Sequence, residues 1–296
     1  AAMTSGAMQS QVSGLSLQSV LAILAYIAPA GGEGTKPAFE NNCPAAAPRF
    51  SNDAGAPRWS GWSPGVTNAR YQPAPGLTAE DVPKLKLKWA VNLGPVTSAR
   101  GQPAVAGGRV FFGTLAGDVY AVDAASGETV WTSRFDEQNR GAVRQNNRGV
   151  AYWTDGRGAE RILAVSPGYQ LLNIDAKTGQ RVASFGKDGV VDLWIGLDRD
   201  GKVKPGTIGL TSAPLVIGDI VVIGMASGVG VSLPTLDNTP GYIRGYDVRT
   251  GKQVWTFHTV PQAGEVGVET WGKDSRGIES WKFTGNTGAW GTLAAD

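Results

Sequence analysis

The feature that most constrains the fold is a turn motif that occurs three times: AVDAASGETVW at 121–131, NIDAKTGQRVA at 173–183 and GYDVRTGKQVW at 245–255. Each copy has Asp, two residues, Ser or Thr, and Gly, followed four residues later by Trp131, Ala183 or Trp255. An Asp carboxylate can accept backbone N–H groups across a turn, and Gly can adopt a positive φ. Each copy therefore predicts a hairpin with a returning strand, on which Phe185 shares the face of the absent Trp in the second copy.

The spacing of these turns indicates a larger repeat. The turn-forming Asp residues are 52 and then 72 residues apart, and the third copy carries about 13 extra residues in the Gly-rich stretch Met225–Gly241. Irregular repeats of this length, built of short strands, are typical of β-propeller blades. The β-rich runs are Leu85–Trp89, Arg109–Gly113, Val119–Val122 and Ile220–Ile223. We expect residues 85–296 to hold about four four-stranded blades in an open arc; a β-sandwich with chance turn similarities is the alternative.

Single-residue counts exclude several kinds of site. The chain has one Cys, Cys43, and one His, His258, so no intrachain disulfide, Cys-x-x-Cys zinc site or Cys-x-x-Cys-His haem attachment can form. A Ser-His-Asp hydrolase would depend on His258 alone. The net charge of +2 leaves no basic footprint for nucleic acid. We expect the chemistry to come from a bound cofactor or from residues outside the chain.

Residues 1–30 differ in character from the rest. Leu15, Leu17, Leu21, Leu24 and Ile27 recur at roughly helical spacing, which predicts a helix over 15–28, and Pro29 ends the pattern. The apolar run Val20–Ala28 is too short to cross a bilayer. Residues 31–58 are rich in Gly, Pro, Ala and Asn, which is typical of a linker.

The motifs of residues 59–296 resemble those of one enzyme family. The Asp-x-x-Thr-Gly turns with Trp resemble the tryptophan docking motifs of the pyrroloquinoline quinone (PQQ)-dependent dehydrogenases, which are eight-bladed propellers that oxidise alcohols or sugars. Trp62, the run 68–71 and the run 82–89 resemble the opening of this domain in polyvinyl-alcohol dehydrogenases. NRGVAYW at 147–153 resembles segments of methanol, ethanol and glucose dehydrogenases, and 242–261 and 285–296 resemble glucose-dehydrogenase-type relatives. The resemblance implies an all-β fold, part of an eight-bladed propeller.

Three residues match cofactor-binding positions of the family. Arg148 matches the arginine that pairs with PQQ carboxylates, and its planar guanidinium suits that role. Thr211 matches a threonine that hydrogen-bonds the cofactor. Trp290, in NTGAWG, matches the tryptophan that forms the floor beneath the flat cofactor. The alternatives are a surface arginine, a structural threonine and a packing tryptophan.

The chain also departs from the family pattern. The family's calcium-binding carboxylate would fall near Val229, but no Asp or Glu occurs between Asp219 and Asp237. The metal ligands and the general base therefore stay unassigned, and the family's catalytic Asp would lie beyond Asp296. His258 is expected to be a packing or surface residue of a strand. Cys43 would pair outside this chain if the protein is periplasmic.

The N-terminal zone resembles the end of a class I cytochrome c. In that resemblance Met8 is the axial haem ligand, and a thioether sulfur is a neutral, soft ligand that raises the iron potential. The alternative is that Met8 is an ordinary apolar residue. The implied organisation is a cytochrome c remnant at 1–30, a linker at 31–58 and a propeller part at 59–296. The chain is thus expected to be a fragment of a quinohaemoprotein.

The resemblance implies PQQ-dependent oxidation of an alcohol or sugar hydroxyl, on a small or polymeric substrate. Electrons would pass to haem c, a cytochrome c or a quinone. It also implies a periplasmic location, with a signal peptide upstream of Ala1. Because the apolar run Val20–Ala28 is short, no transmembrane segment is expected in this chain. The alternative is a PQQ-like propeller without cofactor that serves as a protein-interaction scaffold, which would lack Arg148, Thr211 and Trp290 in concert.

Overall fold

The computed structural model describes residues 49–51, 58–73, 75–93, 101–114, 117–134, 148–203, 206–227, 236 and 238–296. Met8, Cys43 and the helix expected at 15–28 lie outside these residues. The chain divides into two units, one of 1–39 with 90–95 and one of 40–89 with 96–296. All strands of the described residues belong to the second unit, to which the following description applies.

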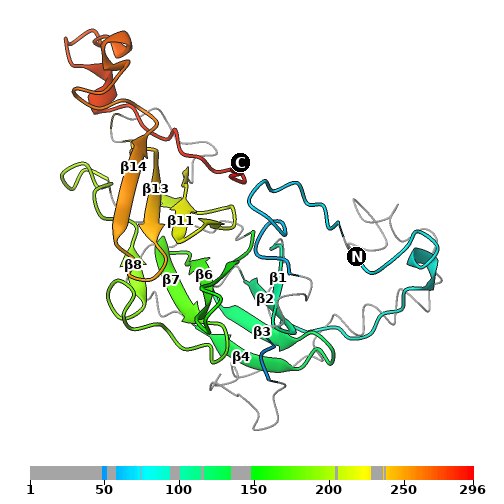
Figure 1. Ribbon diagram of the computed structural model, residues 1–296. Coiled ribbons are helices and arrows are strands. Elements are labelled where there is room, and N and C mark those ends of the chain that lie inside the picture. Colours follow the sequence, from blue (N-terminus) through cyan, green and yellow to red (C-terminus); the bar gives the residue numbers. More distant parts are fainter. Residues whose placement is uncertain are drawn as a thin grey trace, which may run out of the picture. The chain divides into compact units, whose positions relative to one another are not determined.

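Three four-stranded antiparallel sheets follow one another along the chain (Figure 1). The first has the order β1 (Ala104–Ala106), β2 (Arg109–Gly113), β3 (Val119–Asp123) and β4 (Thr129–Ser133). The second has β5 (Ala151–Thr154), β6 (Glu160–Val165), β7 (Gln170–Asp175) and β8 (Val190–Asp192). The third has β10 (Leu215–Ile217), β11 (Ile220–Ile223), β13 (Tyr242–Asp247) and β14 (Gln253–His258). A two-stranded pair joins β9 (Ile208–Gly209) to β12 (Ala226–Ser227).

The contacts between sheets are those of propeller blades. Each sheet is a meander whose first strand lies at one edge, and the first strand of the second sheet, β5, lies against the first strands β1 and β10 of its neighbours. The inner edges of successive sheets therefore meet, as blades do around an axis. This confirms the predicted all-β class and the four-stranded blades.

The three predicted turns form as expected. Asp123 Oδ1 accepts hydrogen bonds from Ala125 N at 3.0 Å and Ser126 N at 2.7 Å. Asp175 and Asp247 bind the corresponding backbone N–H groups of their own turns. The motif glycines at 127, 179 and 251 have φ values of +78°, +75° and +73°, which a residue with a Cβ adopts only under strain.

Tryptophans join one sheet to the turn of the next. The fully buried Trp131 of β4 donates from Nε1 to Ala176 O at 3.1 Å, and its ring lies over Gly179, where a Cβ would come within 2.7 Å. Trp89 repeats this arrangement on the first sheet, donating to Ala124 O at 3.1 Å and lying over Gly127.

Two hydrophobic cores fill the spaces between the sheets. One includes Phe111, Ala121 and Trp131 of the first sheet with Ile162 and Ile174 of the second. The other joins the second sheet to the third, and includes Leu163, Leu171, Val221, Ile223 and Tyr246. Because strand side chains alternate between faces, the second sheet contributes neighbouring residues to both cores.

Three expectations are corrected by the structure. Leu85–Trp89 is not a strand; Leu85 and Leu87 are exposed, because no neighbouring strand of the described residues pairs with them. Phe185 is buried, but it lies in a turn before β8 rather than on a strand continuous with the second motif. The described residues hold three four-stranded sheets rather than about four, because 259–296 form extended segments and two short 3₁₀ helices, η2 (Val268–Trp271) and η3 (Ser280–Lys282).

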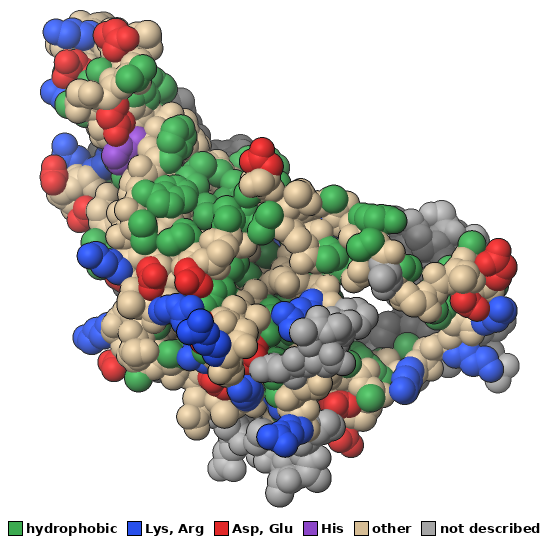
Figure 2. Space-filling model, in the orientation of Figure 1, with side chains coloured by type: hydrophobic (Ala, Val, Ile, Leu, Met, Phe, Trp, Pro, Cys, Tyr) green, Lys and Arg blue, Asp and Glu red, His purple; other side chains and the backbone are tan. Residues whose placement is uncertain are grey.

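A third 3₁₀ helix, η1 (Val82–Lys84), precedes the first sheet. Over the part of the chain that the structure describes, no helix has the length and apolar character needed to cross a bilayer. Hydrophobic side chains gather on the surface between β13 and the C-terminal segment (Figure 2).

Candidate functional site

Two of the three predicted cofactor-binding residues lie just before the first strands of the second and third sheets. Arg148 stands three residues before β5, and Thr211 stands four residues before β10. Trp290, from the C-terminal segment, reaches the same end: Thr211 Oγ1 donates to Trp290 O at 2.6 Å. Thr211 and Trp290, which are 79 residues apart in sequence, are therefore direct neighbours.

Close backbone contacts at two glycines position the Trp290 segment. A Cβ on Gly224, at the end of β11, would lie 2.2 Å from Ala289 O, and one on Gly288 would lie 2.4 Å from Met225 O. Only glycine allows such an approach. Trp290 is left 58% exposed, so this large aromatic residue is accessible to a ligand.

Arg148 is held from its backbone. Its carbonyl accepts a hydrogen bond from Gln102 N at 2.7 Å, and the next residue, Gly149, forms a bridge with Gln102. A Cβ on Gly149 would lie 2.5 Å from Gln102 O and 3.5 Å from the Cβ of Ala213, two residues after Thr211. The backbone at Arg148 thus lies close to the chain that carries Thr211, at the same end of the sheets.

The Thr211 hydroxyl has a specific orientation. Because it gives its hydrogen to the Trp290 carbonyl, the oxygen meets a ligand in this arrangement only as an acceptor. Its direct structural effect is to hold the Trp290 segment. The local chemistry combines a hydroxyl oxygen with an exposed tryptophan, beside the backbone that bears Arg148.

His258 has structural partners on β14. Its Nδ1 lies 2.6 Å from Glu265 Oε1, and its ring meets Tyr242 edge-on at 4.4 Å between centroids. The Gln262 backbone N–H, together with His258, lowers the pKa of the Glu265 carboxyl. These contacts tie the segment after β14 to its strand, in line with the predicted packing or surface role.

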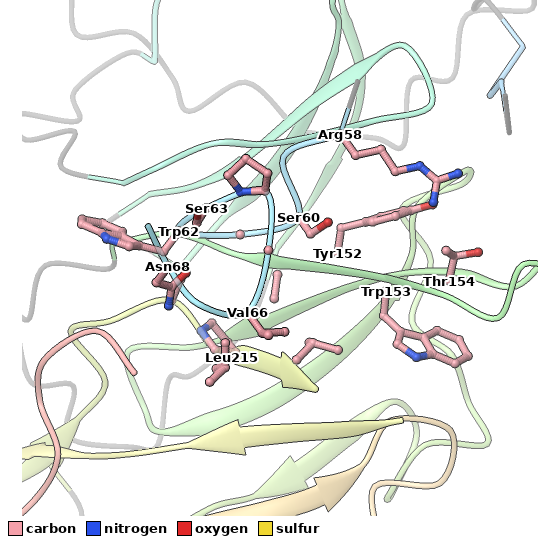
Figure 3. Close-up of a pocket in the computed structure, with 17 residues that line it drawn as sticks. Arg58, Ser60, Trp62, Ser63, Val66, Asn68, Tyr152, Trp153, Thr154 and Leu215 are labelled. Atoms are coloured by element: carbon pink, nitrogen blue, oxygen red, sulfur yellow. The ribbon is translucent and has the colours of Figure 1, made fainter. Parts of the chain in front are cut away.

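A cavity that the sequence did not reveal lies between the inner strands β5 and β10. It has a volume of about 200 Å³ and is closed on one side by residues 58–68 (Figure 3). Trp59 pairs with Val105 of β1, and Tyr152 N donates to Ser60 O at 2.7 Å, so this segment lies along two inner strands. Its polar lining includes Arg58, Ser60 and Thr154; neither Arg148, Thr211 nor Trp290 takes part.

Comparison with known proteins identifies the family. A family model described as "PQQ: Glucose/ethanol/alcohol dehydrogenase, beta-propeller domain" matches residues 59–296, four-fifths of the chain. The chain belongs to this PQQ-dehydrogenase propeller family. The match covers all three sheets and the residues Arg148, Thr211 and Trp290.

Curated relatives of this PQQ-dehydrogenase chain include two polyvinylalcohol dehydrogenases. The one from Pseudomonas sp. is 30% identical over 73% of this chain and 32% of its own length. The one from Sphingopyxis sp. is 29% identical over 94% of this chain and 43% of its own length. The chain thus spans between about a third and two-fifths of these relatives.

Among solved structures, the quinohemoprotein alcohol dehydrogenase ADHIIG from Pseudomonas putida HK5 is similar in fold. The TM-score is 0.54 at 27% identity, over 75% of this chain and 29% of that one. The likeness agrees with the blade-like arrangement of the three sheets.

The described part of the PQQ-dehydrogenase propeller offers no ready metal site. Within these residues no group of three or more His, Cys, Asp or Glu could hold a metal ion. Ser227, which precedes the expected calcium-ligand position, pairs with Ile208 in the small β9–β12 sheet. Val229 itself lies outside the described residues, so the expected departure from the family pattern stays a prediction.

Proposed function

We propose that this chain contributes part of the cofactor site of a PQQ-dependent dehydrogenase that oxidises an alcohol or sugar hydroxyl. The observation that carries the proposal is the meeting of Thr211 and Trp290 at the end of the third sheet, beside the backbone that bears Arg148. Folding alone gives no reason for an open indole to be held there. Membership of the PQQ-dehydrogenase propeller family supports the same conclusion.

The residues present fit PQQ, a flat and negatively charged quinone. Trp290 is 58% exposed, and its indole offers a face for stacking. Arg148 makes no side-chain hydrogen bond or ion pair with the described residues, so its guanidinium is available for a cofactor carboxylate. Thr211 holds the Trp290 segment by its hydrogen bond. PQQ, when bound, supplies the two-electron oxidation of the substrate.

Calcium, haem c and the electron acceptor belong to the proposal for the intact protein. Among the described residues no group of three or more His, Cys, Asp or Glu could hold a metal ion, so no step is assigned to calcium. Haem c ligation by Met8, and electron transfer to haem c or another respiratory acceptor, follow only from the resemblance of residues 1–30. A periplasmic location, and the division into 1–30, 31–58 and 59–296, are proposed on the same ground.

The proposal is tested by PQQ binding to the full chain, measured by equilibrium dialysis. We expect Arg148→Ala to weaken binding by about 2–5 kcal/mol, since truncating one partner of a buried charge pair has that effect. Trp290→Ala should weaken it by about 0.5–1.5 kcal/mol through lost stacking. Arg157→Ala and Trp281→Ala are matched controls, because each removes a side chain of the same type outside the segments that carry Arg148, Thr211 and Trp290. Equal PQQ binding by all four variants would show that Arg148 and Trp290 do not hold the cofactor, and absence of PQQ binding by the parent chain would favour the scaffold alternative.

A further inference from the structure

The cavity under residues 58–68 is a separate place from the proposed cofactor site. Its volume of about 200 Å³ is smaller than the roughly 300–1,000 Å³ of pockets that take drug-sized ligands. It is therefore too small for a tricyclic cofactor. An apolar cavity of about 150 Å³ is enough for a benzene-sized body. A ligand of that size with one small polar group matches the space.

One end of the cavity carries a cation that has no hydrogen-bond or ion-pair partner among the described residues. Arg58 is partly buried and lies beside the Tyr152 phenol (Figure 3). Among the described residues its guanidinium makes no hydrogen bond and no ion pair. The Glu160 carboxylate accepts the hydrogen bond of the Tyr152 hydroxyl, and no ion pair between Glu160 and Arg58 is found among the described residues.

A hydroxyl and apolar walls complete the lining. The Ser60 side chain, like Arg58, has no hydrogen-bond partner among the described residues, while its carbonyl is used by Tyr152 N. Much of the remaining wall is apolar and includes Pro64, Val66 and Leu215. The lining thus combines the donors of Arg58 and Ser60 with apolar walls, and Ser63, Asn68 and Thr154 add further polar groups.

We propose that this cavity binds a small carboxylic acid with an apolar body, whose carboxylate pairs with Arg58 and Ser60. A guanidinium presents parallel N–H donors that match a carboxylate bidentately, and a hydroxyl adds a third donor. The apolar walls favour a hydrocarbon body over a bare inorganic anion, which would leave them unfilled. The unpartnered cation favours an acid over a neutral polyol.

The test is isothermal titration of the full chain with benzoate, with benzamide and inorganic phosphate as comparison probes. We expect benzoate to bind at least tenfold more tightly than benzamide, its neutral isostere, and than phosphate. Arg58→Gln should weaken benzoate binding at least tenfold and leave benzamide unchanged. Arg58→Lys should restore part of the affinity, because the charge returns without the fork. Arg157→Gln, at an exposed turn that does not line the cavity, is the matched control and should bind as the parent chain does.

Thermal melting shows whether each variant is folded, and Ser60→Ala provides a milder change if Arg58→Gln is not. We expect Ser60→Ala to weaken benzoate binding several-fold. Absence of benzoate binding, equal binding of benzamide, or equal binding of phosphate would overturn the proposal. Since no PQQ is used, failure here is separate from failure of the cofactor assignment.

Discussion

At the residue scale, the motif glycines have two separate reasons to be glycine. Gly179 has a positive φ, and a Cβ there would also come within 2.7 Å of the Trp131 ring. Gly156 also has a positive φ, of +68°, but no atom lies within 4 Å of the position that a Cβ would take. Alanine variants at Gly179 and Gly156 therefore separate the cost of backbone strain from the cost of steric contact.

We predict that Gly179→Ala destabilises the fold more than Gly156→Ala. The strain of a left-handed conformation is about 1–2 kcal/mol for each alanine. Gly179→Ala should cost about a further 1–3 kcal/mol, because the buried indole and its hydrogen bond to Ala176 must shift. Urea unfolding measures both changes, and equal losses of stability would show that the Trp131 ring yields to the new methyl group.

The carboxylate of the first turn should make stability depend on pH. The Ser126 backbone N–H, its hydroxyl and the Ala125 N–H hold the pKa of Asp123 below its ordinary 3.8, against the opposing effect of burial. A carboxyl whose pKa is lowered by folding stabilises the native state above its unfolded pKa. That contribution is lost as the pH falls below about 3.8 towards the folded value.

We therefore predict that the unfolding free energy falls more steeply below pH 4 in the parent chain than in Asp123→Asn. The amide cannot titrate, but its oxygen can accept the same turn hydrogen bonds. Urea unfolding between pH 5 and 2.5 gives the two slopes. Parallel slopes would mean that Asp123 has the same pKa in the folded and unfolded states.

At the element scale, the outer strands β4 and β14 occupy equivalent places in their sheets but different surroundings. Trp131 of β4 is fully buried against the second sheet. Trp255, at the same motif position on β14, is 39% exposed, and Val254 and Phe257 are also exposed. The tryptophan of the same sequence motif should therefore contribute more to the free energy of unfolding in the first sheet than in the third.

We predict that Trp131→Ala lowers the unfolding free energy by about 3–5 kcal/mol, as large-to-small changes in cores do. Trp255→Ala should cost about 1 kcal/mol or less, because half-exposed residues lose little contact area. Guanidinium or urea unfolding compares them directly. A large loss at Trp255 would mean that β14 is covered in solution.

How far the sequence alone predicts these elements depends on how local their cause is. The turns at Asp123, Asp175 and Asp247 follow from the motif, since each hydrogen bond lies within four residues. The run Ile220–Ile223 matches β11 at both ends. The run Leu85–Trp89 has the same β-forming composition but no strand partner among the described residues, and strand pairing is not a local property.

The two candidate sites also differ in how far the sequence alone reveals them. Arg148, Thr211 and Trp290 were named through the family motifs, whereas nothing in the sequence marked Arg58 and Ser60. Their cavity forms because a segment before the first sheet lies along β5 and β10, which come roughly 90 and 150 residues later. Contacts over such separations leave no periodic signal.

At the scale of the whole unit, the second sheet connects the other two. Ile162 and Leu163 are consecutive in β6, and both are fully buried. Ile162 belongs to the core shared with the first sheet, and Leu163 to the core shared with the third. One strand thus takes part in both cores through the alternation of its side chains.

This arrangement predicts that truncating Ile162 weakens the core shared with the first sheet, whereas truncating its neighbour Leu163 weakens the core shared with the third sheet. Ile162→Ala and Leu163→Ala should each cost about 2–5 kcal/mol, since each leaves a core cavity. In native-state hydrogen exchange, Ile162→Ala should reduce the protection of β2 and β3 most, and Leu163→Ala that of β11 and β13. The two variants control for each other, because they remove side chains of equal carbon count from adjacent positions of one strand. The selectivity follows if each core opens in its own cooperative unit, as sub-global openings do. If both variants instead lower protection equally in all three sheets, the sheets unfold only together, and the second sheet transmits the loss of either core to the whole unit.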